Sequence, residues 1–118
     1  MKERKDSLIE LCRSLPGATE DVKWGNNLIF SVGGKMFAGF DLPDGEPLSF
    51  KVDPALFDEI ANRKGFVPAP YMAKASWVSV PERKKVPVAT LKKLIVEAHR
   101  LIGEKLSKRR REALGIVG

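Results

Sequence analysis

Residues 28–52, LIFSVGGKMFAGFDLPDGEPLSFKV, form the stretch that decides the predicted fold. It holds three apolar runs of strand length, at residues 28–32, 36–40 and 48–52. Gly33 and Gly34 separate the first two runs, and paired glycines accept the positive φ angles of a tight two-residue hairpin. The turn-rich residues 43–45 precede the third run. These signals predict three antiparallel strands.

Alternation of side chains assigns these runs to two faces of a sheet. Leu48, Phe50 and Val52 share one face of the third run, while Ser49 and Lys51 share the other. The face expected to pack on helices holds Leu28, Phe30, Val32, Met36, Ala38, Phe40, Leu48, Phe50 and Val78. The face expected to be open holds Ser31, Lys35, Phe37, Ser49, Lys51 and Trp77. An open face with two aromatic rings and two lysines favours nucleic acid as a ligand.

Helical signals flank the strands. An apolar stripe from Leu8 to Leu15 predicts a first helix that ends at Pro16. Asp53 before a proline predicts the cap of a second helix over residues 54–63, with Leu56, Phe57 and Ile60 turned inward. A strand is predicted over residues 76–80, and a last helix begins near residue 88. The expected fold is α+β, an antiparallel sheet with flanking helices.

One domain is expected over residues 1–118, with a basic helical tail over about residues 103–118. Residues 1–59 contain 7 Lys and Arg against 11 Asp and Glu, a net charge of −4. Residues 60–118 contain 14 against 4, a net charge of +10. This asymmetry favours an anionic partner. The alternative is that the cations of the tail only solvate the end of the last helix and complement its dipole.

The segment of residues 65–81, GFVPAPYMAKASWVSVP, contains no acidic residue and places Tyr71, Lys74 and Trp77 at steps of three. A cation beside aromatic rings suits a polyanion with planar bases. The alternative is that both rings belong to the core and Lys74 is a solvated tip. Further phosphate contacts are predicted for Arg63, Lys64, Lys84, Lys85 and the tail cations of residues 105–111.

The side chains that carry catalysis are scarce. His99 and Cys12 are the single histidine and the single cysteine, and both lie on apolar helix stripes. One histidine and one cysteine cannot build a zinc site, and the spacing of Asp41, Asp44 and Glu46 does not match a calcium loop. We therefore expect no enzyme activity, no metal and no cofactor.

A lone cysteine and the lack of a leader or membrane-spanning run indicate a cytoplasmic protein that does not bind membranes. Trp24, at the start of the sheet, is expected to fill the core.

The order of several motifs resembles the MmcQ/YjbR-like family of small bacterial proteins. The motifs are Leu15-Pro16-Gly17, Glu20-Asp21, Lys23-Trp24-Gly25, Val32 to Ala38, Ser49-Phe50-Lys51, Asp53-Pro54, Pro70-Tyr71-Met72, Lys74, Trp77-Val78 and Ala98-His99. The resemblance implies a fold similar to the CyaY/frataxin group and a double-wing DNA-binding motif. The positions it carries over are Trp24, Gly33, Gly34, Lys35, Lys51, Tyr71, Met72, Lys74 and Trp77. The mixed charges of the first helix depart from the acidic helix with which frataxin-like proteins bind iron.

Two functions follow as hypotheses. The first is a DNA-binding module that contacts the phosphate backbone through the basic sheet face or wing, with weak sequence preference. The second is a non-catalytic module that binds a protein partner or a small ligand through Tyr71, Met72 and Trp77.

Overall fold

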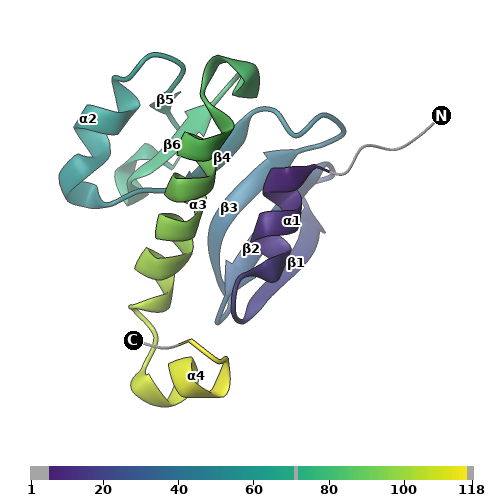
Figure 1. Cartoon of the computed structure of the whole chain (residues 1–118), viewed down its shortest axis with the longest axis vertical. Helices are drawn as coiled ribbons and strands as arrows, with labels where there is room; N and C mark the ends of the chain where they lie inside the picture. Colours follow the sequence, from purple (N-terminus) through teal and green to yellow (C-terminus); the bar gives the residue numbers. More distant parts are fainter. Residues whose placement is uncertain (1–5, 71, 117–118) are drawn as a thin grey trace.

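The centre of the molecule is a six-stranded antiparallel sheet with the strand order β1-β2-β3-β4-β6-β5 (Figure 1). The structure is a computed structural model, and it describes residues 6–70 and 72–116. The strands are β1 (Ala18–Lys23), β2 (Asn27–Val32), β3 (Lys35–Asp41), β4 (Leu48–Lys51), β5 (Val67–Pro68) and β6 (Trp77–Val80). The α-helices are α1 (Ser7–Ser14), α2 (Phe57–Ala61), α3 (Val88–Gly103) and α4 (Lys108–Ala113). Three short 3₁₀ helices are η1 (Pro54–Leu56), η2 (Ala73–Ala75) and η3 (Arg83–Lys85). The predicted α+β class is confirmed.

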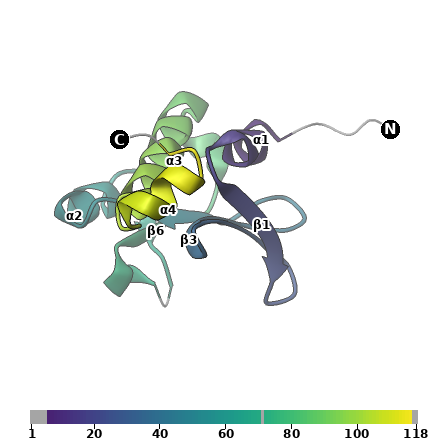
Figure 2. The ribbon, with the colours of Figure 1, turned by 90° about the horizontal axis from the view of Figure 1, so that it is seen from below.

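The helices α1 and α3 cover one face of the sheet (Figure 2). The β1–β2 hairpin and the segment between β5 and β6 extend to the opposite side (Figure 2). The predicted hairpin at residues 33–34 is confirmed, and both glycines have positive φ angles, 60° and 81°. The alternation predicted for β4 is also confirmed, because Leu48, Phe50 and Val52 lie in the main core.

One extra residue in β3 changes the faces predicted for that strand. Phe30 pairs with Ala38 and Ser31 pairs with Met36, so Phe37 is an additional residue between them. The Phe37 side chain is fully buried, 5.3 Å from the ring of His99 and 6.4 Å from the ring of Phe30. Met36, opposite Ser31, lies on the far face instead. The expectations of an open Phe37 and a core-facing Met36 were therefore wrong. Lys35 is exposed, but it pairs with the core residue Val32, so its expected place on the open face was also wrong.

Two strands, β1 and β5, were not predicted from the sequence. β1 is an edge strand whose four central residues are all exposed, so no apolar alternation marks it. β5 contains two residues and ends in a proline. In the second helix, Asp53 caps η1 as predicted and accepts a hydrogen bond from the Ala55 amide at 2.9 Å. Leu56 is 45% exposed, so its predicted inward orientation was wrong.

The basic tail is a separate helix rather than the end of the last one. α3 ends at Gly103, and α4 begins after the cap residue Ser107, whose hydroxyl accepts from the Arg110 amide at 3.2 Å. The first turn of α4 contains Lys108 and Arg109 and no acidic residue. Cations at the start of a helix oppose its dipole. The alternative that the tail cations complement the helix dipole therefore does not explain why Lys108 and Arg109 are basic.

A partly buried ion pair joins the start of α1 to η3, the short helix that precedes α3. The Arg83 guanidinium donates to both carboxylate oxygens of Asp6, at 2.7 and 2.8 Å, and lies 5.6 Å from the centre of the Phe40 ring. Asp6 also caps α1, accepting from the amides of Leu8 and Ile9. Burial acts to raise the pKa of Asp6, but the Arg83 interactions and the two amide hydrogen bonds outweigh it and lower the pKa.

We expect Asp6→Asn to lower the free energy of unfolding by about 2 kcal/mol, because Arg83 loses its charged partner. The contribution of the carboxylate is present above about pH 4 and is lost as the pH falls through the lowered native pKa. Urea unfolding at pH 7 and at pH 3 measures both effects. Glu112→Gln, an exposed carboxylate on α4, is the control; an equal loss in both variants would contradict the role of the ion pair.

Candidate nucleic-acid interface

The tip of the β2–β3 hairpin holds α4 in place. A Cβ atom at Gly33 would lie 2.6 Å from the Leu106 side chain, so the leucine packs directly on the glycine backbone. The Arg110 guanidinium donates to the carbonyl oxygen of Gly33 at 3.3 Å. Leu114 packs in the same way over Gly17, where an added Cβ would lie 2.9 Å from the Leu114 Cβ. Because no side chain intervenes at either glycine, the basic helix is fixed against the hairpin.

Exposed cations lie on the β2–β3 hairpin, on η2, on α4 and on the connection before α4, and we call this set the basic strip. Its members are Lys35, Lys74, Lys105, Lys108, Arg109 and Arg110. Lys35 follows the glycine turn, Lys105 lies between α3 and α4, and Lys74 lies on η2. Among the described residues, none of the six forms a salt bridge. A surface of unneutralised cations favours an anionic ligand.

The Lys51 side chain lies next to two of the segments that carry the basic strip, η2 and the α3–α4 connection. Its Nζ donates to the carbonyl oxygen of Ala75, in η2, at 2.5 Å. Burial lowers the pKa of Lys51, and the nearby positive charge of Lys105 lowers it further. Lys51 therefore lies between η2 and the α3–α4 connection. Its side chain is 7% exposed, so the prediction that it stands on an open face was wrong.

The face expected to be open is covered at its β6 end. Trp77 is 5% exposed, because the chain folds back beside it: the amide of Ala69 donates to the Trp77 carbonyl, and the Trp77 amide donates to Met72. Ser49 and Ser79 share a hydrogen bond of 2.7 Å on the same face. The alternative in which Trp77 belongs to the interior is therefore confirmed. Tyr71, the other predicted aromatic residue, lies outside the residues that the structure describes.

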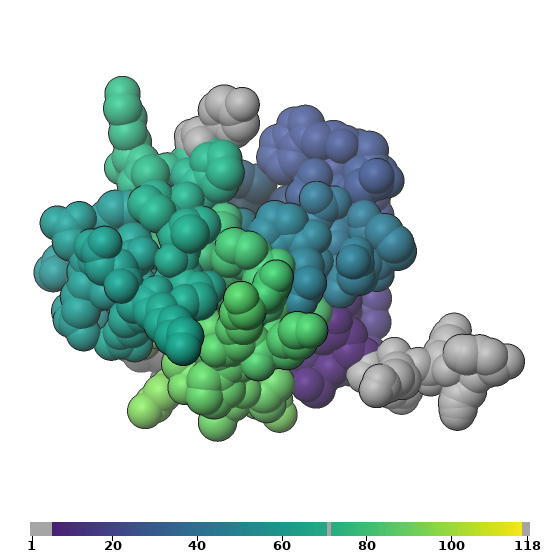
Figure 3. Space-filling model, turned by 90° about the horizontal axis from the view of Figure 1, so that it is seen from above, coloured from purple at the N-terminus to yellow at the C-terminus, as the bar shows by residue number. Residues whose placement is uncertain are grey.

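The other predicted cations gather at the opposite end of α3. Lys64 and Lys85 line one hollow of about 280 Å³, and an added Cβ at Gly65 would lie 2.7 Å from Val86. Figure 3 shows the residues after α2 (teal) beside the start of α3 (green). Arg63 is paired with Glu59, and Lys85 with Glu82, each at 2.9 Å. Lys84 is exposed in the same region.

The α3 helix separates these cations from the basic strip. It has 16 residues and so is about 24 Å long. Arg63, Lys64, Lys84 and Lys85 lie near its first turn, whereas Lys105 and α4 follow its last turn (Figure 1). The predicted site therefore divides into two groups, and the group at the start of α3 is partly neutralised.

Trp24 was missed as a surface residue. It is 70% exposed, has a positive φ of 50°, and lies at the tip of the β1–β2 hairpin. The prediction that it fills the core was wrong. The signal that could have revealed this is the run Gly25-Asn26-Asn27, since glycine and asparagine are typical of hairpin turns.

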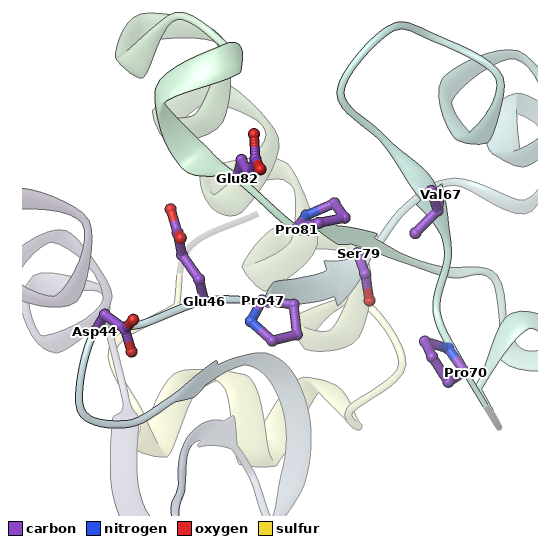
Figure 4. Close-up of a pocket in the computed structure, with 8 residues that line it drawn as sticks. All are labelled: Asp44, Glu46, Pro47, Val67, Pro70, Ser79, Pro81 and Glu82. Atoms are coloured by element: carbon purple, nitrogen blue, oxygen red, sulfur yellow. The ribbon is translucent and has the colours of Figure 1, made fainter.

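A second hollow, of about 420 Å³, has the opposite charge. Asp44, Glu46 and Glu82 stand along one side of it, and prolines line much of the remainder (Figure 4). The Glu46 carboxylate accepts from the Arg83 amide at 2.7 Å. Within the described part of the chain, no three His, Cys, Asp or Glu side chains are grouped so that they could hold a metal ion. Carboxylates repel phosphate, so this hollow does not extend the basic strip.

The two side chains considered for catalysis are engaged in packing. Burial raises the pKa of the Cys12 thiol to about 12, with smaller contributions from Asp6 and Glu20, so the thiolate is disfavoured. The His99 ring is 6% exposed and donates from Nε2 to the carbonyl oxygen of Pro16 at 2.7 Å. In the described residues, no helix combines the length and the apolar character needed to cross a membrane.

The two tryptophans are expected to report opposite environments. Trp77→Phe leaves Trp24 as the only indole, and we expect red-shifted emission that acrylamide quenches strongly, since most of that ring meets solvent. Trp24→Phe leaves Trp77, for which we expect blue-shifted emission and weak quenching. Steady-state fluorescence of the two folded variants measures this. Equal quenching of both would contradict the placement of the rings.

A family model and two solved structures are similar to this chain. The YjbR family model matches residues 13–101. A crystal structure of protein DR2400 from Deinococcus radiodurans, described as a DUF419 domain, is similar with a TM-score of 0.84 and 30% identity over 95% of this chain and 88% of that one. A Pseudomonas syringae protein shares the fold with a TM-score of 0.67 and 19% identity, over 85% of this chain and 99% of that one. No curated protein matches the sequence. The chain belongs to the YjbR family.

Proposed function

We propose that this protein is a non-catalytic module that binds duplex DNA through the phosphate backbone. The observation that carries the proposal is the basic strip, in which six exposed cations on separate segments form no salt bridge with any described carboxylate. Phosphate is the regularly spaced anion that a row of lysines and arginines fits. The engaged states of Cys12 and His99 support the non-catalytic part of the proposal.

Weak sequence preference is part of this proposal. Reading bases in the major groove requires a helix or ribbon that places several side chains against base edges. The cations of the basic strip come from a hairpin tip, a 3₁₀ helix and a helix of six residues. Flexible lysines on such short elements supply charge but little fixed geometry. Contacts to the backbone should therefore dominate over contacts to bases.

The double wing implied by the family resemblance has a counterpart in this proposal. Two segments extend from the far side of the sheet, the β1–β2 hairpin and the chain between β5 and β6 (Figure 2). The second one carries Lys74 and adjoins the basic strip through the Lys51–Ala75 hydrogen bond. Of the two wings, we assign a phosphate contact to this one, through Lys74, and none to the β1–β2 wing, which carries the exposed Asp21.

The expected affinity depends steeply on salt. Six phosphate contacts predict a slope of about −5 for log K against log salt concentration. Lys108→Glu combined with Arg109→Glu removes two contacts, so we expect a slope of about −4 and at least about tenfold weaker binding at 0.1 M salt. Fluorescence anisotropy of a labelled duplex, titrated at several salt concentrations, measures both quantities.

Lys92→Glu combined with Lys93→Glu is the matched control, because it changes the net charge equally on an exposed part of α3. We expect this variant to retain nearly the binding of the unmodified protein. A slope near zero would reject DNA binding. An equal loss in both double variants would show a general charge effect and would reject the basic strip as the site.

A further inference from the structure

The β1 strand is an edge that the described chain leaves unpaired. It lies at one end of the sheet order and pairs only with β2 (Figure 1). All six of its residues pair in continuous register, from Ala18 opposite Val32 to Lys23 opposite Asn27. The strand contains no proline and no bulge, which are features that commonly protect edges from further pairing. Its outer backbone groups are therefore suited to accept another strand.

Apolar side chains are exposed along this edge. Val22 is 51% exposed and Trp24 is 70% exposed, two of the six large hydrophobic residues exposed in the described chain. A hollow of about 850 Å³ lies between α1, β1 and the residues after β3, and Ile9, Leu28 and Leu42 contribute apolar lining to it. A bare edge beside a hollow with a partly apolar lining is typical of surfaces that bind an extended peptide.

Carboxylates surround the same edge. Glu10, Glu20 and Asp44 line the hollow together with Arg13. Arg13 is occupied by two of them, donating to Glu20 at 2.6 Å and to Glu10 at 3.1 Å. The exposed Asp21 lies on the other face of β1, because it pairs with Ile29 whereas Glu20 pairs with the core residue Phe30. Carboxylates therefore outnumber cations in the lining of the hollow. On the other face, Asp21 forms no salt bridge with any described residue, although Lys23 shares that face.

This charge pattern selects among the possible occupants. Nucleic acid is disfavoured by the carboxylates. Two-fold antiparallel pairing of β1 with a second copy of itself, centred on Glu20 or on Asp21, would place two identical carboxylates directly opposite each other, and like charges in opposed positions destabilise a sheet. A cationic strand from another protein would meet Glu20 on one face and Asp21 on the other. It would also meet the exposed Val22 side chain at the rim of the hollow.

We propose that the β1 edge binds an extended, basic segment of a protein partner as a seventh antiparallel strand. Residues opposite Glu20 and Asp21 are Arg or Lys, and the residue opposite Val22 is apolar. Trp24, beyond the end of β1, packs on the partner's chain or on a basic side chain. This surface is separate from the basic strip and does not depend on the proposed DNA binding.

A synthetic peptide tests the proposal. The probe is the blocked hexapeptide Thr-Val-Lys-Arg-Thr-Val, which places Val, Lys and Arg opposite Val22, Asp21 and Glu20 in antiparallel register. We expect saturable binding in an NMR titration and slower amide hydrogen exchange confined to β1. The peptide Thr-Val-Glu-Glu-Thr-Val, and a version of the basic probe with alternate N-methylated amides, should bind at least about tenfold more weakly.

Variants of the protein locate the contact. Asp21→Lys is expected to weaken binding of the basic peptide at least about tenfold, whereas Asp58→Lys, an exposed carboxylate on α2, should leave it unchanged. Both positions are exposed, so folding should be retained, and circular dichroism checks this. The proposal is overturned if β1 amides show no added protection, if both variants lose binding equally, or if sedimentation shows that the edge instead pairs two copies of the chain.

Discussion

The extra residue in β3 is the constraint on which the arrangement of both sheet faces depends. Because Phe37 turns inward with Ala38, its ring meets the edge of His99, with 89° between the ring planes, and packs beside Phe30. His99 in turn bonds to the carbonyl of Pro16, just after α1. The bulge residue Phe37 thus links β3 to α3 through His99, and His99 links α3 to the turn between α1 and β1. The bulge also moves Met36 to the far face.

Two glycines fix the position of the basic helix α4. The absence of a side chain at Gly33 and Gly17 lets Leu106 and Leu114 sit on the backbone, so that α4 lies against the hairpin and the end of α1. A short helix rich in arginine has little intrinsic stability and depends on such contacts. The position of the tail cations therefore results from apolar packing. Those tail cations that are exposed and form no salt bridge with a described carboxylate are the ones proposed to bind phosphate.

Much of the fold could be predicted from local patterns. The glycine hairpin at residues 33–34, the alternation in β4 and the apolar stripe of α3 all act over a few residues, and each signal agreed with the structure. The prediction failed where long-range packing decides. A bulge at Phe37 leaves the apolar pattern of the run unchanged, and the exposed edge strand β1 has no pattern at all. Leu106 continues the stripe of α3, although the helix ends at Gly103.

The candidate site was predictable in part for the same reason. Lys35 and Lys74 were recognised from the sequence and are exposed. The burial of Lys51 and Trp77, in contrast, depends on hydrogen bonds with residues 69, 72 and 75, which fold back beside β6. The separation of Arg63, Lys64, Lys84 and Lys85 from the tail depends on the length of α3. The charge composition predicts that the C-terminal half is basic. The separation of the basic strip from the carboxylates along β1 follows only from the topology.

The most direct test of this division is chemical-shift mapping of the ¹⁵N-labelled protein with a short DNA duplex. The account predicts perturbations at Lys35, Lys74 and residues 105–110, with the β1 edge and the cations at the start of α3 unaffected. Perturbations centred on residues 62–65 and 82–85, or on β1, would contradict it.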